Sequence, residues 1–213
     1  MEFISEGILK YAEEHTSPES GILKEIDRET HVNNLFPRML SGHYQGRFLS
    51  MISSIIKPAC ILEIGTYTGY SAICLTEGLA EGGKIHSIEI NAELEGTIRR
   101  NLERAGVSDR VLLYFGEALK IIPSMNQQFD LVFLDADKIN YGAYYELLIR
   151  QMKPGAIMIA DNVLWSGKVI NKEDRDKEAA KLRDFNDRVN DDARVENILL
   201  PIRDGIMLIR KSK

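Results

Sequence analysis

The stretch Ile61-Leu-Glu-Ile-Gly-Thr-Tyr-Thr-Gly-Tyr-Ser71 joins a short apolar run to two glycines. It is typical of a buried strand that ends near a carboxylate, Glu63, continues through a glycine turn from Gly65 to Gly69, and opens a helix. Such a turn points free backbone N–H groups and the positive end of a helix dipole at whatever binds there. In a parallel α/β sheet this place is the ligand crevice. We therefore expect a ligand at this loop.

Around the loop, short apolar runs alternate with helical stretches, which we expect at about 70–80, 92–105, 117–122, 141–152 and 173–190. The candidate strands are Cys60–Ile64, Lys84–Ile88, Val111–Tyr114, Leu131–Leu134, Ala156–Ala160, Val195–Leu200 and Gly205–Arg210. This alternation predicts right-handed β-α-β units, and so an α/β fold with a mostly parallel sheet. The short link at 201–204 predicts that the last strand is antiparallel.

Residues 1 to about 57 are predicted to be helical. Apolar residues recur at helical spacing in Ile4–Glu14 and in Gly46–Ile56. We expect these helices to form a cap or lid over a catalytic core at 58–213. The 213 residues suffice for one α/β domain, and we expect a single domain over 1–213.

Composition excludes few partners but favours a cytoplasmic protein. The net charge of −5 gives no general attraction to DNA or to an anionic membrane. No apolar run approaches the length that crosses a bilayer, so no membrane is expected as a partner. The two cysteines, Cys60 and Cys74, have no other metal-ligating residues beside them in the sequence, which favours buried free thiols in a reducing cytoplasm.

Polar residues follow four of the predicted strands at the point where each strand ends. They are Glu63 with the glycine loop, Glu89, Asp135, and Asp161 with Asn162. Each alone has an ordinary explanation as a turn or helix-cap residue. Because the carboxyl ends of parallel strands share one edge of the sheet, four such ends together favour a binding site.

The loop itself indicates which ligand it fits. Tyr67 stands where a dinucleotide fingerprint has its middle glycine, which argues against NAD or FAD. Glu89 follows Gly65 by 24 residues and is placed to accept hydrogen bonds from a ribose diol. The pattern favours a nucleoside ligand without a pyrophosphate.

Asp135, Asp161 and Asn162 offer two carboxylates and an amide oxygen. All-oxygen ligands select a hard divalent cation, Mg²⁺, Mn²⁺ or Ca²⁺, over Zn²⁺. Lys138 lies three residues after Asp135, and a lysine near a cation and a buried edge can have its pKa lowered enough to act as a base. The alternatives are that Asp161-Asn162 only turns the chain, that Asp137 only caps a helix, and that Lys138 is a solvated surface residue.

Three motifs resemble the cation-dependent O-methyltransferases, which include the caffeoyl-CoA and catechol O-methyltransferases and bacterial relatives. The motifs are Glu63-Ile-Gly-Thr-Tyr-Thr-Gly-Tyr-Ser71, Asp135-Ala-Asp-Lys138 with Asn140-Tyr141, and Asp161-Asn-Val-Leu-Trp165. The resemblance covers roughly residues 36–210. It implies a Rossmann-like sheet of seven strands with helices on both faces, and a homodimer.

The resemblance also implies which residues do what. S-adenosylmethionine would be the cofactor, with Mg²⁺ the first choice of metal over Mn²⁺ or Ca²⁺. The implied cofactor-binding residues are Met39, Ser41, Glu63, Gly65, Tyr67, Ser71, Glu89, Ala118, Asp135 and Tyr144. The implied metal ligands are Asp135, Asp161 and Asn162, the implied catalytic residues are Lys138 and Asp135, and Trp165 would line the aromatic substrate.

The segment Ser41-Gly-His-Tyr-Gln-Gly-Arg-Phe48 departs from the acidic segment that relatives often carry before the first strand. His43, Tyr44 and Arg47 could therefore face the substrate, and Arg47 is our candidate. Equally, they could be exposed lid residues with Phe48 in the core.

The predicted reaction is methyl transfer from S-adenosylmethionine to a hydroxyl of a metal-chelated vicinal diphenol of the catechol or caffeoyl type, with Lys138 as general base. The alternative acceptor is 5-hydroxyuridine in tRNA. For tRNA, Arg99, Arg100, Arg104 and basic positions at 172–183 would form a phosphate-binding stripe. An NAD-dependent oxidoreductase is disfavoured by Tyr67.

Overall fold

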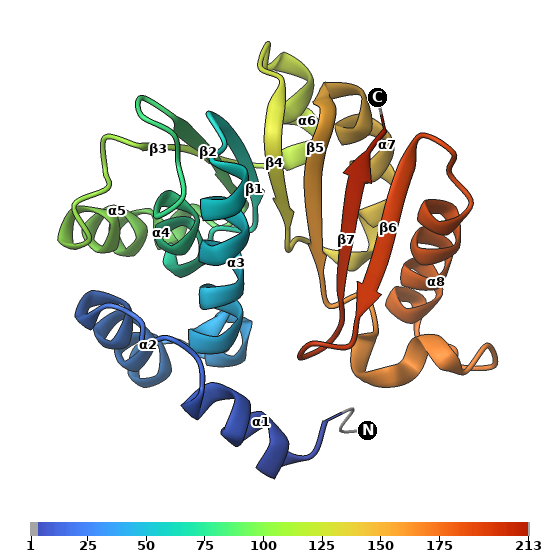
Figure 1. Ribbon diagram of the computed structural model, residues 1–213, viewed down its shortest axis with the longest axis horizontal. Coiled ribbons are helices and arrows are strands. Elements are labelled where there is room, and N and C mark those ends of the chain that lie inside the picture. The colour runs from blue at the N-terminus through green and yellow to red at the C-terminus, as the bar shows by residue number, and fades with distance from the viewer. Residues whose placement is uncertain (1–3, 213) are drawn as a thin grey trace. The chain divides into compact units, whose positions relative to one another are not determined.

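The computed structural model describes residues 4–212. The strands are β1 (Cys60–Ile64), β2 (Lys84–Glu89), β3 (Val111–Phe115), β4 (Phe129–Leu134), β5 (Met152–Asp161), β6 (Val195–Leu200) and β7 (Ile206–Lys211). They form one seven-stranded sheet in the order β3-β2-β1-β4-β5-β7-β6 (Figure 1). The last strand, β7, runs antiparallel to both of its neighbours. The predicted α/β fold with a mostly parallel, seven-stranded sheet is confirmed.

Residues 7–118 form one compact unit, and the chain after residue 118 belongs to a second. The single-domain reading and the boundary predicted near residue 57 stay predictions. No helix in the described part of the chain is both long and apolar enough to span a membrane.

The first unit packs helices against three parallel strands. Its helices are α2 (Gly21–Asn33), α3 (Gly42–Ile56), α4 (Tyr70–Thr76) and α5 (Glu95–Arg104), with short 3-10 turns η1 (Pro37–Met39) and η2 (Ala92–Leu94). The strands β1 and β2 pair in parallel with Ile64 opposite Ile88, and Ile88 lies opposite Tyr114 of β3. Glu63 is the last residue but one of β1, and Glu89 is the last residue of β2. This register therefore brings the ends of both strands to the same edge of the sheet.

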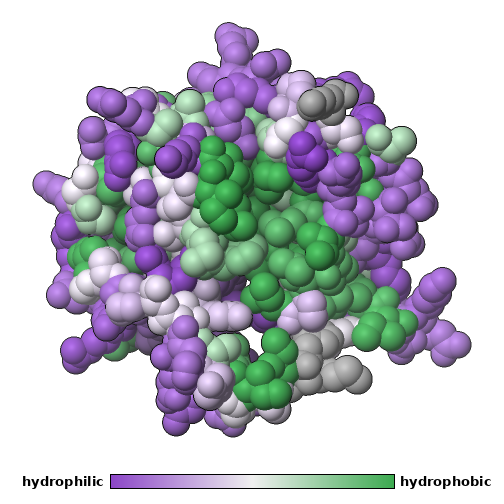
Figure 2. All heavy atoms as spheres, in the orientation of Figure 1, coloured by the Kyte–Doolittle hydropathy of each residue, from purple (hydrophilic) through white to green (hydrophobic). Residues whose placement is uncertain are grey.

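Not every apolar side chain of this part of the chain is inside. On α1 (Glu6–Glu14) no residue is buried, and Ile8 and Tyr11 are exposed. Met51 and Ile55 of α3 are also exposed, and Figure 2 shows hydrophobic side chains gathered where Figure 1 draws α3. Neither Cys60 nor Cys74 forms a disulfide; Cys74 is buried, as predicted, while Cys60 is only half-buried.

The second unit contains β4 to β7 and the helices that cover them. These helices are α6 (Ala118–Ile121, whose first residue ends the first unit), η3 (Ile122–Ser124), η4 (Lys138–Asn140), α7 (Tyr141–Gln151), η5 (Trp165–Ile170) and α8 (Lys177–Asn190). Leu134 of β4 lies opposite Ala160 of β5. The buried face of α8 carries Phe185, on which two tyrosines of α7 stack edge-on.

Strand positions agree closely with the prediction, and the differences have local causes. The helix α3 begins at Gly42, not at Gly46, because residues 42–45 join the helix without adding to its apolar stripe. The strand β5 begins at Met152, before Pro154 and Gly155, which usually end a strand. A register shift opposite Phe129 and Leu131 absorbs these residues as a bulge, and Gly155 has a φ of 81° there.

The contact between α3 and the residues after α4 depends on Gly78. A Cβ atom there would lie 2.1 Å from the backbone carbon of Ser53 and 2.2 Å from the backbone nitrogen of Ser54. Both atoms belong to the backbone of α3, so neither can rotate away.

We therefore expect Gly78→Ala to lower the free energy of unfolding by about 2–3 kcal/mol, the usual scale of an overpacked site. Gly96→Ala is the matched control, since a Cβ on this exposed α5 glycine meets nothing within 4 Å. It should leave stability unchanged or raise it by about 0.5–1 kcal/mol. Urea denaturation of both variants checks this, and equal stability of the two would contradict the packing argument.

Candidate functional site

The glycine loop between β1 and α4 has three residues in the left-handed region. They are Gly65, Tyr67 and Gly69, with φ values of 102°, 51° and 88°. A glycine adopts such angles freely, but a tyrosine does so only when its surroundings hold it there. The Tyr67 N–H donates to Oε2 of Glu89 at 2.7 Å, and this bond fixes the middle of the loop.

Glu63 of β1 supports the loop through hydrogen bonds of its side chain. Its side chain is fully buried, and it accepts hydrogen bonds from the hydroxyls of Ser71, at 2.6 Å, and Ser87. A buried carboxylate is tolerated when such donors surround it. Glu63 and Ser71, both predicted to hold the methionine part of the cofactor, thus bond to each other and tie α4 to β1.

Glu89 lies at the end of β2 and is almost fully buried, with 6% of its surface exposed. Its Oε1 accepts from the Asn91 N–H at 2.8 Å, and its Oε2 accepts from the Tyr67 N–H. Each carboxylate oxygen can accept more than one hydrogen bond. The position is therefore compatible with the predicted bonds to a ribose diol, and it also makes Glu89 part of the loop's support.

Residues that precede β1 also bond to the loop. The Thr30 hydroxyl of α2 donates to the Thr68 hydroxyl at 3.3 Å, and the Tyr67 hydroxyl donates to the Phe36 carbonyl at 3.2 Å. The Tyr70 hydroxyl, at the start of α4, donates to Glu19. Of the other predicted cofactor residues in this unit, Met39 is exposed, whereas Ser41 and Ala118 are buried.

The second group of predicted residues follows β4 and β5. Leu134 lies opposite Ala160, so the residues that follow them, Asp135 and Asp161, lie at neighbouring strand ends. The backbones of neighbouring strands are about 5 Å apart. Asp161 ends β5, and its Oδ1 accepts from the Asn162 N–H at 2.8 Å. Asn162 has a φ of 58°, so this pair does turn the chain, as the simpler reading expects. The turn also leaves Asp161 and Asn162 at the carboxyl end of β5.

Lys138 lies beside these carboxylates and is not a surface residue. Its side chain is 8% exposed, and its Nζ donates to Oδ1 of Asp135 at 2.9 Å and to the Tyr141 hydroxyl at 2.7 Å. Burial alone would lower the pKa of Lys138, but Tyr141 and the Asp135 carboxylate outweigh burial, so the pKa is raised. This is opposite to the lowered pKa that we expected beside a cation, because here Asp135 faces the ammonium itself.

Tyr141 belongs to this site but had no predicted role. It is fully buried, and its hydroxyl donates to the Asp161 carbonyl at 2.9 Å and to the Leu134 carbonyl at 3.2 Å. One hydroxyl thus bonds the ends of both strands and Lys138. The available signal was its place three residues after Lys138 at the start of a helix, in the motif Asn140-Tyr141.

Tyr144 and Asp137 form a pair on the same segment. The Tyr144 hydroxyl donates to Oδ1 of Asp137 at 2.7 Å, and Asn140 donates to the other oxygen at 2.5 Å. The Asp137 side chain makes no cap bond to the helix that follows, so the capping alternative for this residue is wrong.

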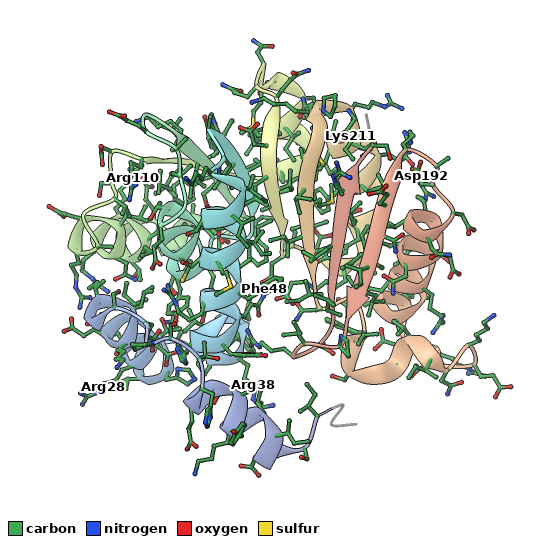
Figure 3. The ribbon with its side chains drawn as sticks, in the orientation of Figure 1. Arg28, Arg38, Phe48, Arg110, Asp192 and Lys211 are labelled. Atoms are coloured by element: carbon green, nitrogen blue, oxygen red, sulfur yellow. The ribbon has the colours of Figure 1, made fainter. Side chains whose placement is uncertain are left out.

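The two predicted substrate residues have different surroundings. Trp165 is half-buried with a φ of 48°, and its Nε1 donates to Asp176 at 3.3 Å. Arg47 instead donates to both carboxylate oxygens of Glu77, at 2.9 and 2.6 Å. The guanidinium of Arg47 is therefore paired with a carboxylate of the first unit. Phe48, next to it on α3, is half-buried rather than in the core (Figure 3).

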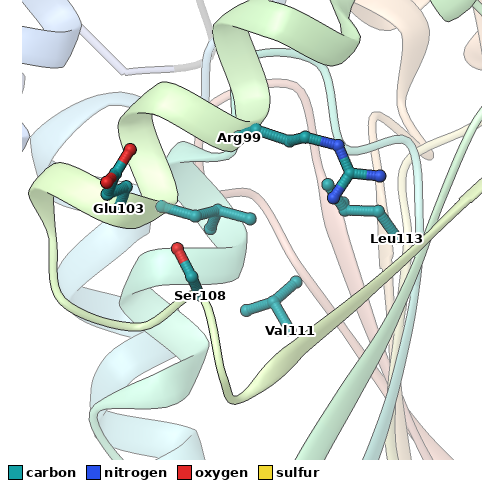
Figure 4. Close-up of a pocket in the computed structure, with 6 residues that line it drawn as sticks. Arg99, Glu103, Ser108, Val111 and Leu113 are labelled. Atoms are coloured by element: carbon teal, nitrogen blue, oxygen red, sulfur yellow. The ribbon is translucent and has the colours of Figure 1, made fainter.

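The arginines proposed for a phosphate-binding stripe are paired with carboxylates. Arg104 bonds Glu25 and Glu29, Arg100 lies 3.8 Å from Glu29, and Arg99 bonds a glutamate of its own helix. Their charge is thus largely compensated within the first unit. An open hollow of about 280 Å³ lies between α5 and β3, lined by Arg99, Leu102, Glu103, Ser108, Val111 and Leu113 (Figure 4). Of these lining residues, only Arg99 had a predicted role, in the phosphate-binding stripe.

The donor set at the ends of β4 and β5 fits a hard divalent cation. Within residues 4–212, no three His, Cys, Asp or Glu side chains gather into a metal-binding cluster. The predicted set has only two carboxylates, and its third oxygen comes from the Asn162 amide. All three ligands are oxygens, and two like charges at adjacent strand ends are stabilised by a positive charge between them.

Comparisons with known proteins agree with these motifs. The family described as O-methyltransferase matches residues 13–212. A catechol O-methyltransferase of Mycobacterium tuberculosis is 39% identical over 147 residues, 68% of this chain and 67% of that protein. A caffeoyl-CoA O-methyltransferase of Eucalyptus globulus is 34% identical over 200 residues, 89% of this chain and 81% of that protein. The crystal structure of an O-methyltransferase from Bacillus cereus in complex with SAH superposes with a TM-score of 0.89 at 31% identity, covering 97% of each chain.

The bonds around Glu89 predict the effect of removing its charge. In Glu89→Gln, one carboxylate oxygen becomes an NH₂ group that faces a backbone N–H, so the loop loses a support and the ligand loses an acceptor. We expect the affinity for S-adenosylmethionine to fall at least about tenfold, as measured by calorimetry. Glu95→Gln, an exposed glutamate of α5, is the control and should bind as the unchanged protein does. Equal affinities of the two variants would remove Glu89 from the site.

Proposed function

The chain belongs to the O-methyltransferase family and is an S-adenosylmethionine-dependent enzyme of the caffeoyl-CoA and catechol type, and we propose that it methylates one hydroxyl of a vicinal diphenol. In this proposal the diphenol is a small molecule of the catechol or caffeoyl class. A divalent cation, with Mg²⁺ as the first choice, would be held at this site and would supply Lewis acidity to the acceptor hydroxyl.

The observation that carries the proposal is the arrangement at the ends of β4 and β5. Asp135 and Asp161 are adjacent in register, and the Lys138 ammonium bonds Asp135 at 2.9 Å. The carboxylates, together with Asn162, would hold the cation, and Lys138 would lie beside the acceptor oxygen. Glu89, Gly65 and the loop amides would hold the nucleoside and methionine parts of the cofactor.

Each protein group has a defined part in the reaction. When bound, the cation supplies Lewis acidity that lowers the pKa of the acceptor hydroxyl and charge that disfavours the Lys138 ammonium. Lys138 in its neutral form takes the hydroxyl proton. S-adenosylmethionine, when bound, would supply its methyl group to the acceptor oxygen, with the O–C bond forming as the C–S bond breaks, and would leave as S-adenosylhomocysteine. Trp165, held by Asp176, would line the aromatic ring.

The proposal also covers the assembly, the location and the acceptor of the protein. A homodimer, as the resemblance implies, would give the exposed Met51 and Ile55 of α3 a surface to cover them. A cytoplasmic location is consistent with two cysteines that form no disulfide. No contact in the described residues supports tRNA as acceptor, since the arginines of α5 are paired with glutamates.

The direct test is methyl transfer to a panel of catechols and to hypomodified tRNA, followed by mass spectrometry. We expect a methylated catechol product with Mg²⁺, no product with EDTA, and a loss of at least about 100-fold in Asp161→Ala, because the cation loses a charged ligand. Asp187→Ala, an exposed aspartate of α8, should retain activity. Turnover that EDTA leaves unchanged would exclude the metal, and methylation of tRNA alone would exclude the small-molecule acceptor.

For the lysine, Lys138→Ala should lower kcat by about 100-fold or more, the usual scale of general-base catalysis, with the S-adenosylmethionine affinity within about twofold. Lys153→Ala removes a half-exposed lysine that pairs with Asp130 in the same unit and should change neither quantity. Steady-state kinetics and calorimetry separate the two effects. If Lys138→Ala kept its turnover, Lys138 would not be the base.

A further inference from the structure

Lys138 is held by two acceptors, and only one of them is a predicted metal ligand. Its Nζ lies 2.9 Å from Oδ1 of Asp135 and 2.7 Å from the Tyr141 hydroxyl. A cation that binds Asp135 therefore competes with the ammonium for the same carboxylate. The other acceptor, Tyr141, is untouched by that competition.

Tyr141 cannot follow the lysine if the lysine moves. Its ring is fully buried and stacks edge-on against Phe185 of α8, with centroids 5.4 Å apart. Its hydroxyl proton is directed at the carbonyls of Asp161 and Leu134, so its lone pairs face the ammonium. Tyr141 is thus a fixed hydrogen-bond acceptor for the Nζ of Lys138.

The cost of separating Lys138 from Asp135 depends on that acceptor. Lys138 is 6% exposed, so water is poorly placed to replace a lost partner. A buried ammonium that keeps one acceptor is penalised far less than one that keeps none, because the penalty is largest for a fully unpaired charge. The hydrogen bond to Tyr141 therefore lowers the free-energy cost of breaking the bond between Lys138 and Asp135 when a cation binds Asp135.

We propose that Tyr141 is a positioning residue that retains Lys138 while the cation takes Asp135, and so sets the cation affinity of this site. The proposal rests on the proposed function, since it takes Asp135 as a metal ligand. Without the Tyr141 hydroxyl, Lys138 would be left with Asp135 alone and would hold it against the cation.

The experiment titrates Mn²⁺ alone into the full-length protein at pH 7, by calorimetry, in four forms: unchanged, Tyr141→Phe, Lys138→Met, and both substitutions together. We expect Tyr141→Phe to weaken Mn²⁺ binding about tenfold or more, the scale of one hydrogen bond to a charged group. In the Lys138→Met background the same substitution should change the affinity less than about twofold, because no ammonium is left to compete.

Tyr145→Phe is the matched control. Tyr145 is also fully buried on α7 and stacks on Phe185, at 6.0 Å, but its hydroxyl bonds Asp192 after α8 (Figure 3). It should leave Mn²⁺ affinity unchanged, and thermal melting of each variant confirms folding.

Three results would overturn the proposal. The first is an unchanged Mn²⁺ affinity in Tyr141→Phe. The second is an equal loss in the presence and absence of Lys138, which would assign Tyr141 only a structural role at the strand ends. The third is a failure of the unchanged protein to bind Mn²⁺, and this result alone would also overturn the metal-dependent function.

Discussion

The parallel pairing of β4 with β5 is the constraint on which the candidate metal site depends. With Leu134 opposite Ala160, the next residues in register are Asp135 and Asp161, two carboxylates on adjacent strands. Two carboxylates at neighbouring strand ends repel each other. The Lys138 ammonium bonds Asp135 and offsets part of this repulsion, and the buried Tyr141 hydroxyl accepts a hydrogen bond from the same ammonium. A divalent cation bound by both carboxylates would offset the repulsion further.

The carboxylates of the first unit serve another purpose. Glu63 and Glu89 are buried, but both accept from donors that belong to the loop or its neighbours: Ser71 and Ser87 for Glu63, and the N–H groups of Tyr67 and Asn91 for Glu89. These hydrogen bonds stabilise both buried carboxylates. They hold a loop whose Tyr67 adopts a left-handed conformation at a cost of about 1–3 kcal/mol. Carboxylates thus support the glycine loop in the first unit, whereas in the second unit Asp135 pairs with the Lys138 ammonium.

The strand positions could be predicted from the sequence because each strand is a short run rich in apolar residues. Cys60–Ile64 and Val195–Leu200 were predicted at their observed bounds. The bonds of long polar side chains could not be predicted, because they depend on which helix lies opposite. Arg47 is an example: its sequence position suggested a ligand-facing residue, but the packing of α3 against α4 brings Glu77 within 2.6 Å. Tyr141 was missed for the same reason, since a tyrosine at a helix start has many possible partners.

The charge of Lys138 shows why the order of the residues is insufficient to assign a mechanism. Proximity to a metal site suggested a lowered pKa, yet in the free protein the pKa of Lys138 is raised, because Tyr141 and the Asp135 carboxylate together outweigh burial. The lysine and the proposed cation therefore share Asp135 as a partner. A positive charge bound to Asp135 would weaken the stabilisation of the Lys138 ammonium and so favour the neutral lysine that can accept a proton. Asp135 therefore connects two properties of the site. They are its affinity for a cation and the ability of Lys138 to act as a base.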